Sequence, residues 1–211
     1  VKTDVNKRNN SDFALWFKRV GKFSDHVMRW ESPWGDGFPG WHIECSAMSI
    51  KYLGEQMDIH TGGEDHLSIH HPNEIAQSEG ATGKKPFSKF WIHVAFLAVD
   101  GKKMSKSLGN FYNIRDILDK GFDPIALRYL YLGAHYKKPM NFTWQSLESA
   151  QKGLKRLQST VALLKSSQRT VLSGEKNEKV EEYRNKFNEA INDDLNTSKS
   201  MAVLFEMLKS N

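Results

Sequence analysis

Apolar residues recur at helical spacing through the last third of the chain. Beyond about residue 141 they follow one another at three- and four-residue steps in three stretches, which predicts three amphipathic helices. Their apolar positions are Leu147, Ala150, Leu154, Leu157, Val161 and Leu164, then Val180, Tyr183, Phe187 and Ala190, then Met201, Leu204, Phe205 and Leu208. Thr197 is the expected N-cap of the third helix, and the polar segment 166–178 is the expected exposed connector between the first two.

The preceding part of the chain alternates between helix and strand patterns. A helix is predicted over residues 41–53, where apolar residues keep to one broad face and Gly54 supplies a stop. A short apolar run that ends at Ile59 predicts a buried strand, and the Thr-Gly-Gly sequence over 61–63 predicts a break after it. Ligands of open α/β sheets bind at such strand ends.

Further elements follow the same alternation. A helix is predicted to begin near Pro72 and to close at Gly80. Alternating apolar residues over 94–98 predict a strand, which the Asp-Gly pair at 100–101 ends in a tight turn. Asp123 is the expected N-cap of another helix, with proline in its first position. The sequence therefore predicts an α/β domain over 1–140 joined to a helical bundle over 141–211.

Composition and charge indicate which partners and which compartment suit the protein. The chain has 211 residues and a formal net charge of +5, a modest excess that could favour a polyanionic partner. It shows neither a long apolar run nor a charged leader, so we expect a cytoplasmic protein. Cys45 stands alone, which rules out an internal disulfide and leaves the thiol free for a metal or for chemistry. The polar beginning at Val1 suggests a piece of a longer protein.

Cys45 and a histidine cluster form a candidate metal site. His66, His70, His71 and Glu74 fall within nine positions, and His70 and Glu74 are four apart, so they can share one helix face. A thiolate, an imidazole and a carboxylate are ordinary zinc ligands. The alternative is a buried free cysteine beside surface histidines that hydrogen-bond locally. The number of clustered histidines favours the metal.

A lysine-rich loop, "DGKKMSKSLGN", is a candidate anion-binding site. Lys103 and Lys106 flank Ser105, and glycines at 101 and 109 allow the backbone to move, so ammonium and hydroxyl groups can reach an anionic group. Such donors stabilise the charge that develops on a departing pyrophosphate. The alternative is a solvated turn that happens to be rich in lysine.

Aromatic residues crowd the segment "WESPWGDGFPGWH" just before the cysteine. We expect most of them, including Trp30, Trp34 and Phe38, to pack around a loop. Trp41, four residues before Cys45, is the one that we expect in a pocket wall.

The ordered strings "GWHIECSAMS", "MDIHTGGEDHLSIHHPNEIAQSEG" and "WIHVAFLAVDGKKMSKSLGNF" resemble cysteinyl-tRNA synthetases, a family of class I aminoacyl-tRNA synthetases. The match covers most of residues 12–208. The resemblance implies the second half of a Rossmann-like class I catalytic domain, followed by an α-helical domain that docks tRNA. It also implies an enzyme that activates L-cysteine with ATP and Mg²⁺ and transfers it to the 3′ end of tRNA(Cys).

The resemblance implies a role for each part of the two candidate sites. Lys103 and Lys106 are the implied catalytic residues, and Lys106 with Ser105 and Ser107 the implied ATP-binding group, closing on the triphosphate as pyrophosphate departs. The implied zinc ligands are Cys45, His70 and Glu74, and the implied cysteine-binding residues are Trp41, His60 and Asp65. The zinc takes the substrate's sulfur, which separates cysteine from serine better than an apolar pocket could.

The chain also departs from the family pattern. The His-Ile-Gly-His signature and a second zinc cysteine have no counterpart, and the far C-terminal anticodon-contacting part is expected to lie beyond Asn211. His66, Ile69 and Pro72 replace more usual residues in the zinc loop, which we interpret as lineage variation. We therefore expect the 211 residues alone to be inactive. The alternatives are a cysteine ligase that acts on an amino sugar and a non-catalytic zinc-containing module that binds RNA; the lysine loop argues against the second.

Overall fold

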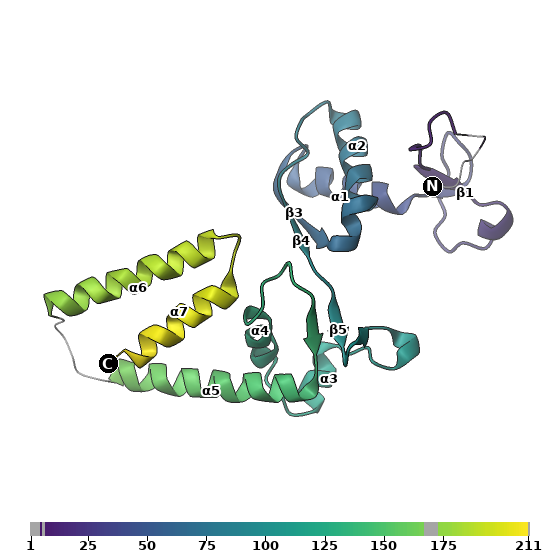
Figure 1. The fold of residues 1–211 in the computed structure, drawn as a ribbon. Coiled ribbons are helices and arrows are strands. Elements are labelled where there is room, and N and C mark those ends of the chain that lie inside the picture. Colours follow the sequence, from purple (N-terminus) through teal and green to yellow (C-terminus); the bar gives the residue numbers. More distant parts are fainter. Residues whose placement is uncertain (1–4, 6, 167–172, 211) are drawn as a thin grey trace. The chain divides into compact units, whose positions relative to one another are not determined.

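The computed structural model describes residues 5, 7–166 and 173–210, which form two compact units, Val1–His93 and Val94–Asn211. Figure 1 shows their elements along the colour scale. The predicted domain boundary at 140/141 stays a prediction, since compactness alone divides the chain at another place. None of the helices in the described ranges is both long and apolar enough to cross a membrane.

The first unit begins with a small aromatic hairpin. β1 (Trp16–Lys18) pairs in antiparallel fashion with β2 (Gly37–Pro39), and a 3₁₀ turn, η1 (Gly21–Phe23), lies between them. Phe38 is buried and its ring stacks on His26 at 3.7 Å between centroids. Trp30 and Trp34, by contrast, are more than half exposed, although the Trp34 ring lies 6.3 Å from that of Trp16 between centroids. The hairpin itself was not predicted.

Two helices and two strands make up the rest of the first unit. They are α1 (Trp41–Leu53), β3 (Met57–Gly63), α2 (His70–Thr82) and β4 (Ser88–Val94), with a 3₁₀ turn, η2 (Glu64–Ser68), before α2. α1 and α2 pack together, and β3 and β4 form a two-stranded sheet. The predicted helix over 41–53 and its stop at Gly54 are confirmed.

Two predicted boundaries in this unit are wrong. β3 continues through Gly63, so the expected break at 61–63 is extended strand. The strand is not the buried one expected, since Ile59 is 56% exposed and Met57 is its one buried residue. α2 begins at His70, and Gly80 lies inside it. The helix ends before Gly83, which has the left-handed conformation (φ 69°) that a C-cap glycine adopts at little cost. Both glycines fit a helix end by residue type, and only the backbone conformation distinguishes them.

The second unit opens with a three-stranded sheet in the order β6-β5-β7. β5 (Leu97–Val99) pairs antiparallel with β6 (Lys102–Lys103) and parallel with β7 (Met140–Phe142). Asp100 and Gly101 both have positive φ, 49° and 73°, so the predicted tight turn is confirmed. The single strand expected over 94–98 is wrong: β4 ends at Val94 and β5 begins at Leu97.

Short helices lie between β6 and β7 in the sequence. A 3₁₀ turn, η3 (Lys106–Leu108), follows β6, and α3 (Ile114–Asp119) and α4 (Pro124–Leu132) come next. The predicted cap of α4 is confirmed, because the Asp123 side chain accepts a hydrogen bond from the amide of Ile125 at 2.8 Å. One apolar core holds these elements to the long helix that follows; its buried members are Val99, Ile117, Ala126, Leu127, Phe142 and Leu147.

The three predicted amphipathic helices are present as α5 (Trp144–Ser166), α6 (Gly174–Asn192) and α7 (Thr197–Lys209). Asn196, and not the predicted Thr197, caps α7: its side chain accepts from the amide of Lys199 at 3.2 Å. The predicted connector is partly wrong, since residues 174–178 are helical; residues 167–172 lie outside the described part of the chain. Helices at the end of an α/β arrangement confirm the predicted fold class.

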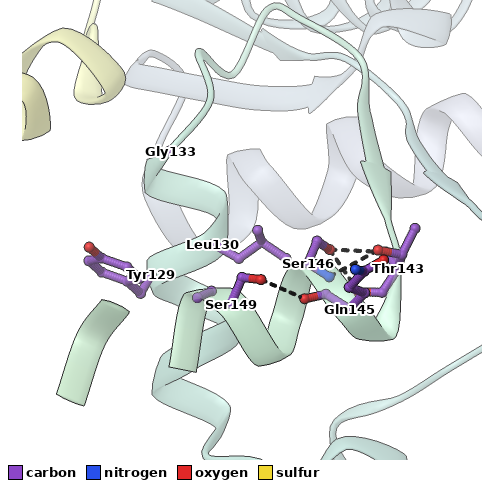
Figure 2. A pocket seen from close by; sticks show the side chains of 8 residues that line it. Tyr129, Leu130, Gly133, Thr143, Gln145, Ser146 and Ser149 are labelled. Carbon is purple, nitrogen blue, oxygen red and sulfur yellow. Dashed lines mark hydrogen bonds between the residues drawn. The ribbon is translucent and has the colours of Figure 1, made fainter. Parts of the chain in front are cut away.

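A cavity of about 560 Å³ lies between α4 and the start of α5 (Figure 2). Its polar wall is engaged in capping the helix: the amide of Ser146 donates to Thr143 Oγ1 at 3.0 Å, and the amide of Thr143 donates to Ser146 Oγ at 3.1 Å. Tyr129, Leu130 and Ala150 supply much of the remaining surface. The cavity therefore offers few free polar groups to a ligand.

Replacing Leu147 by alanine should destabilise the second unit. Its side chain is fully buried in the core, so we expect Leu147→Ala to lower the free energy of unfolding by about 2–5 kcal/mol. Leu163→Ala, on the same helix but 73% exposed, is the matched control and should change it by less than about 0.5 kcal/mol. Hydrogen exchange of the α4 and α5 amides measures both. Equal effects would contradict the assignment of this core.

Candidate functional site

Three side chains from α1 and α2 meet in the first unit. Cys45 lies on α1, whereas His70 and Glu74 lie one turn apart on α2. One sulfur, one imidazole nitrogen and one carboxylate oxygen of this set all lie within 4.8 Å of one another. The i, i+4 spacing that suggested a shared helix face thus holds, and the packing of α1 on α2 adds the thiol.

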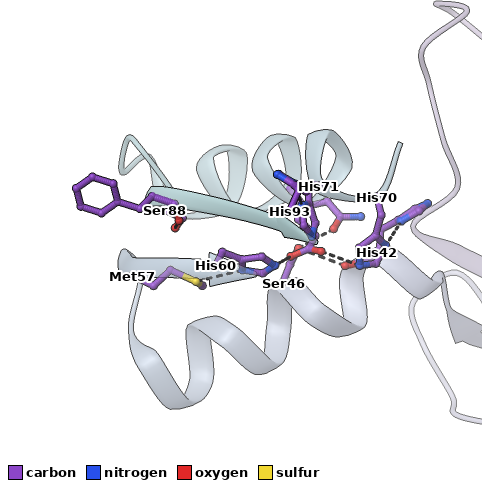
Figure 3. A network of polar contacts seen from close by, with 11 residues as sticks. His42, Ser46, Met57, His60, His70, His71, Ser88 and His93 are labelled. Carbon is purple, nitrogen blue, oxygen red and sulfur yellow. Dashed lines mark hydrogen bonds and ion pairs between the residues drawn. The ribbon is translucent and has the colours of Figure 1, made fainter. Parts of the chain in front are cut away.

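Glu74 lies between two imidazoles of this network, those of His60 and His70, which are labelled in Figure 3. Its side chain is fully buried, and neither carboxylate oxygen receives a hydrogen bond from a residue that the structure describes. Oε1 lies 2.7 Å from Nε2 of His70, and Oε2 lies 3.2 Å from Nε2 of His60. A buried carboxylate needs compensation by protons or a cation, because transfer out of water costs far more for an ion than for a neutral group.

A histidine that the sequence interpretation missed holds His70 from the other side. Nδ1 of His42, on α1, lies 2.7 Å from Nδ1 of His70. This contact engages one ring nitrogen of His70 and leaves Nε2 to face Glu74 and Cys45. The available signal was the position of His42 three residues before Cys45, which puts both on one face of the predicted helix.

A second layer of histidines surrounds Glu74. Nδ1 of His71 pairs with Nε2 of His93, from β4, at 2.7 Å, and Nδ1 of His60 lies 3.2 Å from the sulfur of Met57. Burial lowers the pKa of His71 to about 4, and it also lowers the pKa of His70 and of His93. These three imidazoles are therefore neutral at pH 7, the form in which histidine binds metals.

The set fits a zinc ion by chemistry as well as by position. Burial, then the charges of Glu74 and Glu44, raise the pKa of the Cys45 thiol, so the sulfur keeps its proton until a cation replaces it. Sulfur, imidazole and carboxylate are the donor types that zinc combines. The carboxylate without hydrogen bonds supplies an acceptor that a cation would satisfy.

The proposed amino-acid contacts divide into two groups. The Trp41 ring, 59% exposed at the start of α1, lies 4.4 Å from the His70 ring between centroids, and His60 contacts Glu74, so both border the ligand set. Asp65 is exposed on η2, with its carboxylate turned back against Gly63. Of the three proposed contacts, Trp41 and His60 thus lie next to the ligand set.

The lysine loop lies in the second unit and is tied down at two points. Met104 packs against the core. Asn110 closes the loop, since its side chain accepts from the amide of Ser105 at 2.9 Å and donates to the carbonyl of Lys103 at 3.1 Å. The hydroxyls of Ser105 and Ser107 lie 2.8 Å apart. The backbone of the loop is therefore held by hydrogen bonds, and its Met104 side chain is anchored in the core.

The two lysines of this loop are exposed to solvent and can reach an anionic ligand. Lys103 and Lys106 are both exposed, and the Lys106 ammonium lies 5.5 Å from the centre of the Phe111 ring. Two cations with adjacent hydroxyls can bind an anionic group. The same exposure also fits a solvated turn, so geometry within this unit leaves both interpretations open.

Comparison with known proteins resolves the family. The family model for the tRNA synthetases class I (C) catalytic domain matches residues 1–152, and the model for the DALR domain matches residues 186–210. A cysteine--tRNA ligase of Treponema denticola is 45% identical over 230 residues, covering 99% of this chain and 46% of that protein. That of Carboxydothermus hydrogenoformans is 48% identical over 214 residues, covering 99% of this chain and 44% of that protein.

A solved structure agrees on the fold. The chain described as LeuRS in a ternary complex from Agrobacterium radiobacter K84 matches with a TM-score of 0.62 at 16% identity, over 86% of this chain and 29% of that one. The chain spans less than half the length of the curated relatives named above. The resemblance found in the sequence is confirmed: the chain belongs to the cysteine--tRNA ligase family of class I tRNA synthetases.

Proposed function

We propose that the protein carrying this chain activates L-cysteine with ATP and transfers it to the 3′ end of tRNA(Cys), in the cytoplasm. The observation that carries the proposal is the meeting of Cys45, His70 and Glu74 at one point in a chain of this family. The relatives named as cysteine--tRNA ligases cover nearly the whole chain and support the same reaction.

Zinc is the proposed resident metal, held by Cys45, His70 and Glu74. When bound, the ion supplies a soft Lewis acid that favours a thiolate over a hydroxyl, the difference between cysteine and serine. The protein's part is to keep the ligands oriented. His42 fixes the ring of His70, and burial of Glu74 excludes water from its carboxylate.

The residues around the ligand set would hold the rest of the amino acid. Trp41 offers an exposed indole face beside His70, which suits a pocket wall. We assign His60 and Asp65 to the amino and carboxylate groups of cysteine as a pair, without a choice between the two contacts. His60 already lies at the ligand set, whereas Asp65 lies on an exposed turn after β3.

The lysine loop would act on ATP, which binds with Mg²⁺. Lys106, with Lys103, would place positive charge on the triphosphate as pyrophosphate departs, and Ser105 and Ser107 would donate to phosphate oxygens. The closing contacts of Asn110 hold the turn in shape while both ammonium groups stay in solvent. The fixed base of the turn would limit the reorganisation that these donors need to reach the phosphates.

Two other functions are less well supported. Ligation of cysteine to an amino sugar would use the same pocket, but the DALR-domain match at residues 186–210 and the names of the relatives favour tRNA. A non-catalytic zinc module that binds RNA would have no use for the lysine loop. tRNA is also the partner that the modest positive net charge suits.

Metal analysis tests the ligand set. We expect one zinc ion per chain at this set in the full-length protein, and its loss in Cys45→Ala, because the thiolate supplies the only sulfur among the three ligands. Glu44→Gln removes a neighbouring carboxylate of α1 that lies outside the set and serves as control. Zinc content equal in all three proteins, measured by elemental analysis, would refute the assignment.

His42 should tune the metal without binding it. We expect His42→Phe to weaken zinc binding by about 10- to 100-fold, since loss of the partner frees the His70 ring to turn. Competition with a coloured chelator gives the affinity. The control is His135→Asn, in the second unit. Unchanged affinity in His42→Phe would mean that the contact with His70 has no positioning role.

Lys106 should act on the rate and not on amino-acid binding. Because its charge is needed mainly in the transition state, we expect Lys106→Ala to slow adenylate formation by about 10²-fold while the affinity for cysteine stays the same. Cysteine-dependent pyrophosphate exchange measures the rate. Lys155→Ala, an exposed lysine of α5, is the control. Normal exchange in Lys106→Ala would exclude the proposed role.

A further inference from the structure

We propose a second divalent-cation site beside the first, formed by His60, His71 and Glu74 and selective for zinc-like ions. One ligand atom from each of these residues lies within 4.8 Å of the other two. The two sets share only Glu74. The inference rests on the proposed function in one respect, that Glu74 also serves the ion held by Cys45 and His70.

The two oxygens of Glu74 face different partners. Oε1 lies 2.7 Å from His70, a member of the first set, and Oε2 lies 3.2 Å from His60, a member of the second. Within the described part of the chain neither oxygen accepts a hydrogen bond, although the side chain is fully buried. A carboxylate in this position can bridge two cations, one on each oxygen.

The surroundings of His60 leave its Nε2 without a proton when the ring is neutral. Its Nδ1 lies 3.2 Å from the sulfur of Met57, and a thioether can only accept. Nδ1 is therefore the donor, so Nε2 of the neutral ring presents a lone pair to Oε2 of Glu74. Two lone pairs that face each other across 3.2 Å repel unless a cation or a proton lies near them.

His71 is oriented in a matching way. Its Nδ1 lies 2.7 Å from Nε2 of His93, and with Nδ1 as the donor, Nε2 is free for a metal. That edge of the ring lies close against Gly62: a Cβ placed there would come within 2.7 Å of Nε2. Because Gly62 has no side chain, the imidazole has the room that it occupies. His93 orients the ring of His71, as His42 orients the ring of His70.

The donor set determines which ions fit. Two imidazoles and a carboxylate favour zinc or cobalt over magnesium or calcium, which prefer oxygen ligands. The second set contains no sulfur, whereas the first contains Cys45. This difference gives each site its own spectroscopic signature. A cation at the second site would also engage His60, a residue assigned to the cysteine substrate, so excess zinc would compete with that contact.

Cobalt titration of the metal-free full-length protein tests the proposal. We expect two Co²⁺ ions per chain. The first brings the thiolate-to-cobalt absorption band of Cys45, and the second adds intensity in the visible region without a further thiolate band. His60→Asn and His71→Asn should each weaken the second ion by about 100-fold or more, while the thiolate band persists as an internal sign that the unit is folded. His135→Asn should leave both ions in place.

The outcomes separate this inference from the proposed function. If no thiolate band forms, the first set is wrong and the second falls with it, because the shared ligand is no longer established. A thiolate band with only one ion bound shows that a proton, and not a metal, lies between His60 and Glu74, which overturns the second site alone. Two ions that are both unaffected by His60→Asn and His71→Asn also overturn it.

A measurement on the unaltered protein covers the case in which buried His71 cannot be replaced without unfolding. Two cobalt ions that share the Glu74 carboxylate are magnetically coupled. We therefore expect the electron paramagnetic resonance signal of the first ion to lose intensity as the second binds. Full retention of that signal with two ions bound would place the second ion elsewhere and refute the bridging role of Glu74.

Discussion

A buried carboxylate organises the first unit. Glu74 is shielded from water and faces only imidazole nitrogens among its described ion-pair partners, and an uncompensated ion in such a place costs several kcal/mol. Three elements of the unit bring side chains to this carboxylate. α1 brings a thiol, α2 brings an imidazole one turn from the carboxylate, and β3 brings the ring of His60. The side chains that pack around Glu74 are thus also the side chains that can bind a cation.

The lysine loop of the second unit differs from this site, because its charged groups are exposed and not buried. Its anchors, Met104 in the core and Asn110 across the turn, are fixed, whereas Lys103 and Lys106 are exposed. An ammonium group in solvent has no desolvation cost, and its flexible side chain can carry it to a phosphate. A soft-metal site demands buried and rigid ligands, but a pyrophosphate site needs mobile donors on a firm base. The chain keeps these two requirements in separate units.

Local features of the sequence predicted local structure well. The spacing of His70 and Glu74, the Asp-Gly turn at 100–101 and the Asp123 cap are short-range effects, and each is present as expected. Contacts between elements could not be predicted in this way: the pairing of His42 with His70 depends on how α1 packs on α2. The wrong helix ends have a physical reason too. Gly80 and Gly83, or Thr197 and Asn196, suit the same role by type, and the extent of the packed helix decides between them.

The central claim is that a metal held by Cys45, His70 and Glu74 selects the substrate by its sulfur. X-ray absorption at the zinc edge of the full-length protein tests it most directly. The account predicts sulfur at about 2.3 Å together with nitrogen or oxygen at about 2.0–2.2 Å in the resting protein. It also predicts one additional sulfur when cysteine is added and no change when serine is added. A zinc shell without sulfur, or one that cysteine leaves unaltered, would contradict it.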